Sequence, residues 1–123
     1  MARSRLPNYL RTYRRRYGLS QDELAMLLGA VSGTKVSRYE NFARMPVVET
    51  IFAYEIVFNQ PASELFAGAY EAIRATLQPR AKRLLKQLTV DAAGKPNARI
   101  ARKLELLRGI IESGLPGRNN QEP

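Results

Sequence analysis

The chain has 123 residues, enough for one compact domain with a small appendage. Lysine and arginine number 20 against 11 aspartates and glutamates, so the net charge of +9 favours a polyanionic partner such as nucleic acid. Histidine and cysteine are both absent, which excludes disulfides, Cys/His zinc sites and imidazole acid/base chemistry, so we expect no enzymatic activity, no cofactor and no bound metal.

The sequence predicts neither a membrane anchor nor an export signal. The longest uninterrupted apolar run, from Leu24 to Val31, includes a glycine and is far shorter than the roughly 18 residues that span a bilayer. The first residues lack the apolar core of a signal peptide. We therefore expect a cytoplasmic protein, associated with the nucleoid if nucleic acid is its partner.

A first helix is predicted from Asn8 to Tyr17. Leu10, Tyr13 and Tyr17 recur at i, i+3 and i+7 and so share one face, and Gly18 is suited to end the helix. The first 20 residues contain no acidic side chain to offset their arginines, which lie either on a solvated helix face or against phosphates. These arginines are Arg3, Arg5, Arg11, Arg14, Arg15 and Arg16.

Two further short helices are predicted on either side of a tight break. The first of them begins at Ser20, where Ser20-Gln-Asp-Glu23 has the form of a capping box, with the serine hydroxyl and the glutamate carboxylate each accepting from the other residue's amide. Gly29 ends this helix. The next helix spans about Gly33 to Asn41, after a small, turn-like segment.

A fourth helix is predicted to begin at Pro46, and a short fifth opens at Pro61 and ends at Phe66. No alternating pattern typical of a strand occurs. Longer amphipathic segments follow, and Pro79 is expected to kink or interrupt the first of them.

The last part of the chain is predicted to hold one more helix between two irregular segments. Residues 89–96 have the composition of a loop. Ile100, Leu104, Leu107 and Ile111 then form one apolar stripe, with basic side chains away from it. From Gly114 the composition is typical of a disordered tail.

Several motifs follow one another between residues 10 and 66. They are Gly18-Leu-Ser-Gln-Asp-Glu-Leu-Ala25, Leu28-Gly29, Val36-Ser-Arg-Tyr-Glu-Asn41, Pro46 and Glu64-Leu-Phe66. This order and spacing resembles the helix-turn-helix domain of Cro/C1-type (XRE-like) repressors. The expected fold is all-α: a five-helix lambda-repressor-like helix-turn-helix domain in residues 1–68, a C-terminal helical extension in residues 69–113, and a tail in residues 114–123.

The resemblance implies that the third helix enters the major groove of DNA as a recognition helix. Gly33 to Arg38 would form its exposed face, with Lys35 and Arg38 suited to the O6 and N7 atoms of guanine. Val36 and Tyr39 would turn into the core. The implied contacts to base edges or phosphates are Gln21, Gly33, Thr34, Lys35, Ser37 and Arg38, and those to the DNA backbone are Asn41, Arg44 and Arg15. The resemblance also implies a structural ion pair between Arg14 and Glu40.

The sequence departs from the family's pattern at three places. Six residues separate Gly29 from Val36 where the pattern has five. The sequence therefore does not specify which of residues 33 to 35 contacts a base. Phe42 stands where the pattern usually has a helix-ending glycine. Val47 and Pro61 stand where small polar caps are usual, so the fourth and fifth helices are expected to lack a side-chain cap.

The leading interpretation is a sequence-specific regulator that binds double-stranded DNA, most simply a repressor that binds a palindromic operator as a homodimer through its C-terminal helices. One alternative is the antitoxin and autorepressor of a toxin–antitoxin pair, whose C-terminal helices would hold a protein partner. Another is an RNA-binding or protein-bridging factor. RNA recognition usually exposes aromatic side chains for base stacking, whereas Tyr9, Tyr13, Tyr17 and Tyr39 have the spacing of a helical core.

Overall fold

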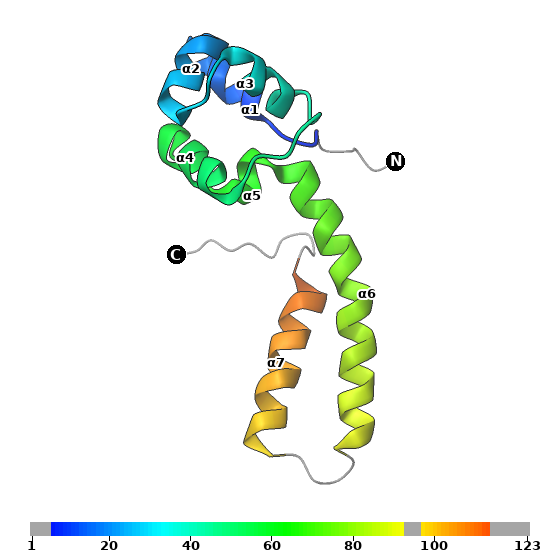
Figure 1. Ribbon diagram of the computed structural model, residues 1–123. Helices are drawn as coiled ribbons and strands as arrows, with labels where there is room; N and C mark the ends of the chain where they lie inside the picture. Colours follow the sequence, from blue (N-terminus) through cyan, green and yellow to red (C-terminus); the bar gives the residue numbers. More distant parts are fainter. Residues whose placement is uncertain (1–5, 93–96, 114–123) are drawn as a thin grey trace. The chain divides into compact units, whose positions relative to one another are not determined.

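The computed structural model describes residues 6–92 and 97–113, which contain seven helices and no strand. The chain divides into two compact units, residues 1–70 and 71–123. The predicted all-helical class is confirmed. The helices are α1 (Leu10–Arg16), α2 (Gln21–Leu28), α3 (Gly33–Glu40), α4 (Val48–Phe58), α5 (Ala62–Leu65), α6 (Ala67–Asp91) and α7 (Ala98–Glu112) (Figure 1).

The core of the N-terminal unit receives side chains from each of α1 to α5. Tyr54 lies at its centre, with its ring centroid 6.1 Å from that of Phe58 and 6.2 Å from that of Phe66. The hydroxyl of Tyr54 has no hydrogen-bond partner in the described part of the chain, and burial raises the pKa of this phenol, which stays neutral. The most deeply buried large side chains are Tyr54, Phe58, Leu10, Leu24, Leu65 and Val36.

Local capping sets the ends of α1 and α2. The Ser20 hydroxyl accepts from the amide of Glu23 at 3.0 Å, and the Glu23 carboxylate accepts from the amide of Ser20 at 2.8 Å, so the predicted capping box is confirmed. Gly29 ends α2 in the left-handed conformation, with φ 74°. α1 begins two residues later than predicted, because the Asn8 side chain accepts from the amide of Leu10 instead of joining the helix.

Helices α3 to α5 begin in different ways. Ser32 caps α3 by accepting from the amide of Thr34, a cap that the sequence analysis did not identify. The predicted lack of a side-chain cap at Val47 and Pro61 is confirmed. The carboxylate of Glu55 on α4 instead accepts from the amide of Ala62, so a neighbouring helix caps α5.

The structure corrects the predicted extent of α6. Pro79, which was expected to kink or interrupt the helix, does not interrupt it, and the helix continues to Asp91. Thr89, which was expected in a loop, lies within the helix, with its hydroxyl donating to the carbonyl of Leu85. Proline removes one helical hydrogen bond, but the apolar side chains on both sides of Pro79 share one face only if the helix continues. The rest of the predicted loop, residues 93–96, and the predicted tail, residues 114–123, lie outside the described residues.

In the C-terminal unit, α6 and α7 lie side by side and antiparallel (Figure 1). The side-chain amide of Gln78 on α6 donates to the carbonyl oxygens of Ile110, Ile111 and Ser113 at 3.3, 3.2 and 2.8 Å, so it satisfies the end of α7. Ala81 and Leu107 are buried, whereas five larger apolar side chains of this unit are exposed: Ile73, Leu77, Leu84, Val90 and Leu106. This unit therefore buries little apolar surface by itself.

Phe42 provides a direct test of backbone strain. It follows the C-cap of α3 with φ 58°, a left-handed conformation that costs most L-residues about 1 to 2 kcal/mol. We expect Phe42→Gly to be about 1 kcal/mol more stable than Phe42→Ala, since both variants lose the ring and only glycine adopts this φ freely.

Urea unfolding of the two Phe42 variants measures this difference. At an ordinary helix position alanine is the more stable of the two residues. An alanine variant as stable as the glycine variant would show that position 42 carries no such strain.

Candidate nucleic-acid interface

The helices α2 and α3 are joined by a tight turn whose contacts position α3. The amide of Gly33, the first residue of α3, donates to the Asp22 carboxylate at 2.9 Å. A Cβ atom at position 33 would lie 2.6 Å from that carboxylate oxygen and 2.9 Å from the Cβ of Gln21. The expectation that Gly33 is exposed is therefore wrong: it is buried against α2, and the close approach requires glycine.

The remaining expected residues of α3 divide between the solvent and the core. Thr34, Lys35 and Arg38 are exposed and Ser37 is half-buried. Val36 and Tyr39 are buried, as the resemblance implies. α3 therefore presents polar and cationic side chains from its first two turns, on the side away from its apolar contacts.

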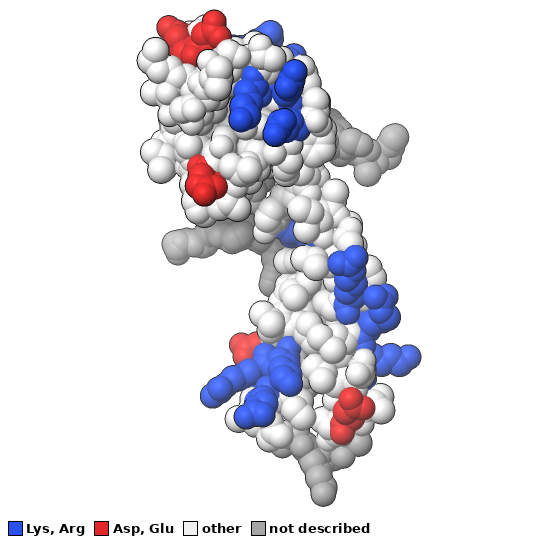
Figure 2. Space-filling view, viewed as in Figure 1, with Lys and Arg blue, Asp and Glu red and all other residues white. Residues whose placement is uncertain are grey.

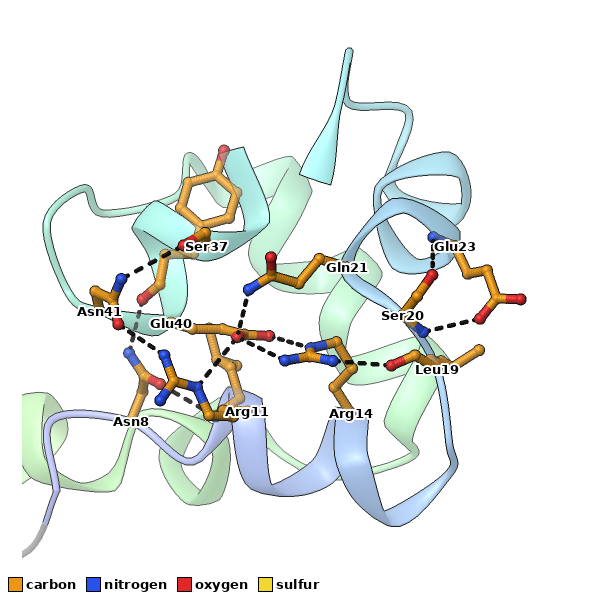
Figure 3. Close-up of polar contacts among 12 residues, drawn as sticks. Asn8, Arg11, Arg14, Leu19, Ser20, Gln21, Glu23, Ser37, Glu40 and Asn41 are labelled. Carbon is orange, nitrogen blue, oxygen red and sulfur yellow. Dashed lines mark hydrogen bonds and ion pairs between the residues drawn. The ribbon is translucent and has the colours of Figure 1, made fainter. Parts of the chain in front are cut away.

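The carboxylate of Glu40, the last residue of α3, joins three helices. Its side chain is fully buried, and it accepts from Arg14 of α1 at 2.6 and 3.1 Å and from Gln21 of α2 at 3.2 Å (Figure 3). Arg14 also donates to the carbonyl oxygen of Leu19, and only a tenth of its side chain is exposed. The expected pair between Arg14 and Glu40 is thus present in the structure.

The charge states of this pair follow from its surroundings. Burial raises the pKa of Glu40, but the hydrogen bonds from Arg14 and Gln21 and the charge of Arg14 together lower it by more, so the net pKa lies below that of a free glutamate. The hydrogen bond from Arg14 to Glu40 raises the pKa of that guanidinium against the effect of burial. Both groups are therefore charged at neutral pH.

Two residues that sequence reasoning missed complete this network. Arg11 donates to Asn41 at 2.8 Å and forms a longer contact of 3.5 Å with Glu40, and the side chain of Asn8 donates to the carbonyl oxygen of Tyr39 (Figure 3). Arg11 precedes Arg14 by three residues, so helical spacing places it on the same side of α1. That spacing is the signal that could have identified it.

The expected backbone contacts differ in how firmly they are held. Gln21 is half-buried, and one of its amide hydrogens is already donated to Glu40. Asn41 is exposed and held by Arg11 and Ser37. Arg15 and Arg44 are exposed. In Figure 2, lysine and arginine side chains gather on the N-terminal unit in the region of α3, and acidic side chains lie towards α2 and α4.

Comparison with known proteins identifies the type of domain. A family model for a helix-turn-helix domain matches residues 5–53, which include α1, α2, α3 and the first part of α4. No curated protein and no solved structure matches the chain. The N-terminal unit therefore contains a helix-turn-helix domain, consistent with an XRE-like family, and such domains are typical of DNA-binding regulators.

The described residues show two further properties. They include no group of three histidine, cysteine or acidic side chains that could hold a metal ion. None of their helices is both long and apolar enough to cross a membrane.

Removal of the Glu40 carboxylate tests the network. We expect Glu40→Ala to lower the free energy of unfolding by about 3 to 5 kcal/mol, because it leaves the guanidinium of Arg14 with little solvent and no carboxylate. Chemical denaturation measures this loss, and Glu23→Ala, which removes only an exposed capping carboxylate, is a milder control expected to cost about 1 kcal/mol. Unchanged stability of Glu40→Ala would contradict the structural role.

The stabilisation that the Glu40 carboxylate provides depends on pH. Since the folded pKa of Glu40 is lowered, its stabilising effect is fully present above the pKa of the unfolded state and is lost as the pH falls through the folded pKa. The difference in stability between the wild type and Glu40→Gln is therefore expected to shrink in acid. A difference that is constant with pH would exclude the charged pair as its source.

Proposed function

We propose that this chain is a sequence-specific, double-stranded DNA-binding transcriptional regulator, most simply a repressor that binds a palindromic operator as a homodimer. The observation that carries the proposal is the exposure of Lys35 and Arg38 on α3 of a helix-turn-helix domain. Occupation of the operator would block transcription. We assign the chain no catalytic activity, and binding to chromosomal DNA would place it on the nucleoid in the cytoplasm.

Recognition would proceed through the first two turns of α3 in the major groove. Lys35 and Arg38 can donate to guanine O6 and N7, while Thr34 and Ser37 offer hydroxyls to either base edge. Phosphate contacts from outside the groove would set the register of α3 on the duplex. They would come from Gln21, Asn41, Arg44 and Arg15.

The Glu40 network supports this function by fixing α3 before DNA arrives. Glu40 ends the recognition helix, and its carboxylate is held by α1 and α2. Asn41, one residue further on, is held by Arg11. A helix that is already positioned loses less conformational entropy on binding, so more of its contact energy appears as affinity.

The proposed dimer contact lies in the C-terminal unit. Leu77 and Leu84 on α6 are each 44% exposed, and Leu106 on α7 is 67% exposed. A second copy of the chain would cover such apolar side chains and give the two-fold symmetry of a palindromic operator. A toxin bound to the same side chains would make the chain an antitoxin, and co-purification of a second polypeptide would distinguish that case.

Substitutions on α3 test base recognition. If Lys35 or Arg38 contacts a base, Lys35→Ala or Arg38→Ala is expected to cost about 1 to 3 kcal/mol of binding and to relax the preference at one operator position. Gln21→Ala is the control, since loss of a phosphate contact weakens all sequences alike. Selection of DNA from a random pool by each variant gives the preference. Identical preferences in the wild type and both α3 variants would show that neither residue recognises sequence.

Truncation tests the dimer contact. A chain that ends after Tyr70 retains the hydrogen bond from the amide of Ala69 to the carbonyl of Pro7, and it retains the buried Ala67. We expect this fragment to be folded, monomeric and weaker in binding than the full chain. Leu77→Glu with Leu84→Glu in the full chain is expected to give the same monomer. Sedimentation that finds both forms still dimeric would assign the contact to the N-terminal unit.

A further inference from the structure

The C-terminal unit carries a second concentration of positive charge. Residues 80–86 of α6 and residues 99–103 of α7 contain exposed cations and no acidic residue. Figure 2 shows lysine and arginine side chains on both edges of this unit, with acidic side chains near them. We refer to these cations as the basic surface: Arg80, Lys82, Arg83, Lys86, Arg99, Arg102 and Lys103.

On α6 most of the basic surface is separated from the apolar stripe. Successive helical residues are about 100° apart, so Leu77, Ala81 and Leu84 share one side, Lys82, Arg83 and Lys86 lie around the other, and Arg80 borders the stripe beside Leu84. Ala81 is buried, whereas the three cations on the other side are exposed. A protein that covers the apolar stripe therefore leaves these cations accessible.

The cations of α6 and α7 come level with one another at Lys86. The two helices are antiparallel (Figure 1), and Gln78 bonds to the carbonyl oxygens of residues at the end of α7. Lys86, further along α6, consequently lies at about the level of Arg102 and Lys103, whereas Arg80 and Arg83 lie beside the second half of α7. Both helices thus contribute cations at the level of Lys86.

The basic surface contains no acidic residue, although Glu105 follows it on α7 and Asp91 follows it on α6. No cation of the set forms an ion pair with a described acidic residue, and the pairs that do form in the described chain involve Arg11, Arg14 and Arg74. Arg80 and Arg83, and likewise Lys82 and Lys86, are like charges at helical contact spacing, which destabilises a helix. A bound polyanion relieves this repulsion.

We propose that the basic surface binds the phosphate backbone of the same DNA duplex that α3 contacts, without reading sequence. The proposal rests on the proposed function for the identity of the polyanion. The chain that presents the basic surface also carries the helix-turn-helix domain. Binding of DNA by α3 therefore raises the effective concentration of DNA near the basic surface.

The salt dependence of binding distinguishes this contact from a solvated surface. The test variant is the full chain with Arg80→Gln, Arg83→Gln, Lys86→Gln and Arg102→Gln, which removes charge at exposed helical positions with a good helix former. Its matched control keeps the charge, with Arg80→Lys, Arg83→Lys, Lys86→Arg and Arg102→Lys. The affinity of each form for a mixed-sequence duplex is measured over a series of salt concentrations.

We expect the slope of log affinity against log salt to fall by about 0.9 for each phosphate contact that the glutamine variant loses. The charge-preserving control is expected to keep the wild-type slope, and both variants are expected to keep the sequence preference selected from a random pool. Thermal melts of the free proteins check that the helices are intact.

The outcomes separate the two proposals. Equal slopes in the wild type and the glutamine variant overturn the second contact and leave the proposed function in place. A reduced slope in a protein without any sequence preference supports the second contact and contradicts the proposed function. Absence of duplex binding contradicts both, and loss of binding to phosphatidylserine vesicles with an unchanged DNA slope assigns the basic surface to a membrane and overturns the contact.

Discussion

The buried carboxylate of Glu40 is the constraint on which the N-terminal unit depends. A buried charge is unfavourable unless it is paired, and here the compensation comes from Arg14 on α1 and Gln21 on α2. Because the pair forms only when α1, α2 and α3 are in place together, it selects one arrangement of these helices. Apolar packing around Tyr54 supplies the driving force for folding, and the ion pair fixes the positions of α1, α2 and α3 relative to one another.

That arrangement explains why α3 presents one side to solvent. Its apolar residues, Val36 and Tyr39, are buried, and its first residue, Gly33, approaches α2 so closely that a side chain would clash. The polar and cationic residues between them are left outside. The strained backbone at Phe42 belongs to the same geometry, since the chain must reverse directly after the helix that Glu40 anchors.

The C-terminal unit has a smaller apolar core than the N-terminal unit. Its buried apolar side chains are few, and a proline lies within α6, so the unit has little stability to spare. On α6, an apolar side and a basic side are turned in different directions. A protein partner and a nucleic acid could therefore bind the unit together, without competing for one face.

The sequence by itself determined the features that depend on neighbouring residues. The capping box at Ser20, the left-handed glycine at the end of α2 and the helical periodicity all arise within one or two turns, so they can be read directly. The Arg14–Glu40 pair was expected only through the resemblance, since its partners are 26 residues apart. Tertiary structure alone decided the burial of Gly33, the capping of α5 by Glu55, and the contacts of Arg11 with Glu40 and Asn41. Each of these depends on where a second helix packs, and local propensity carries no information about that position.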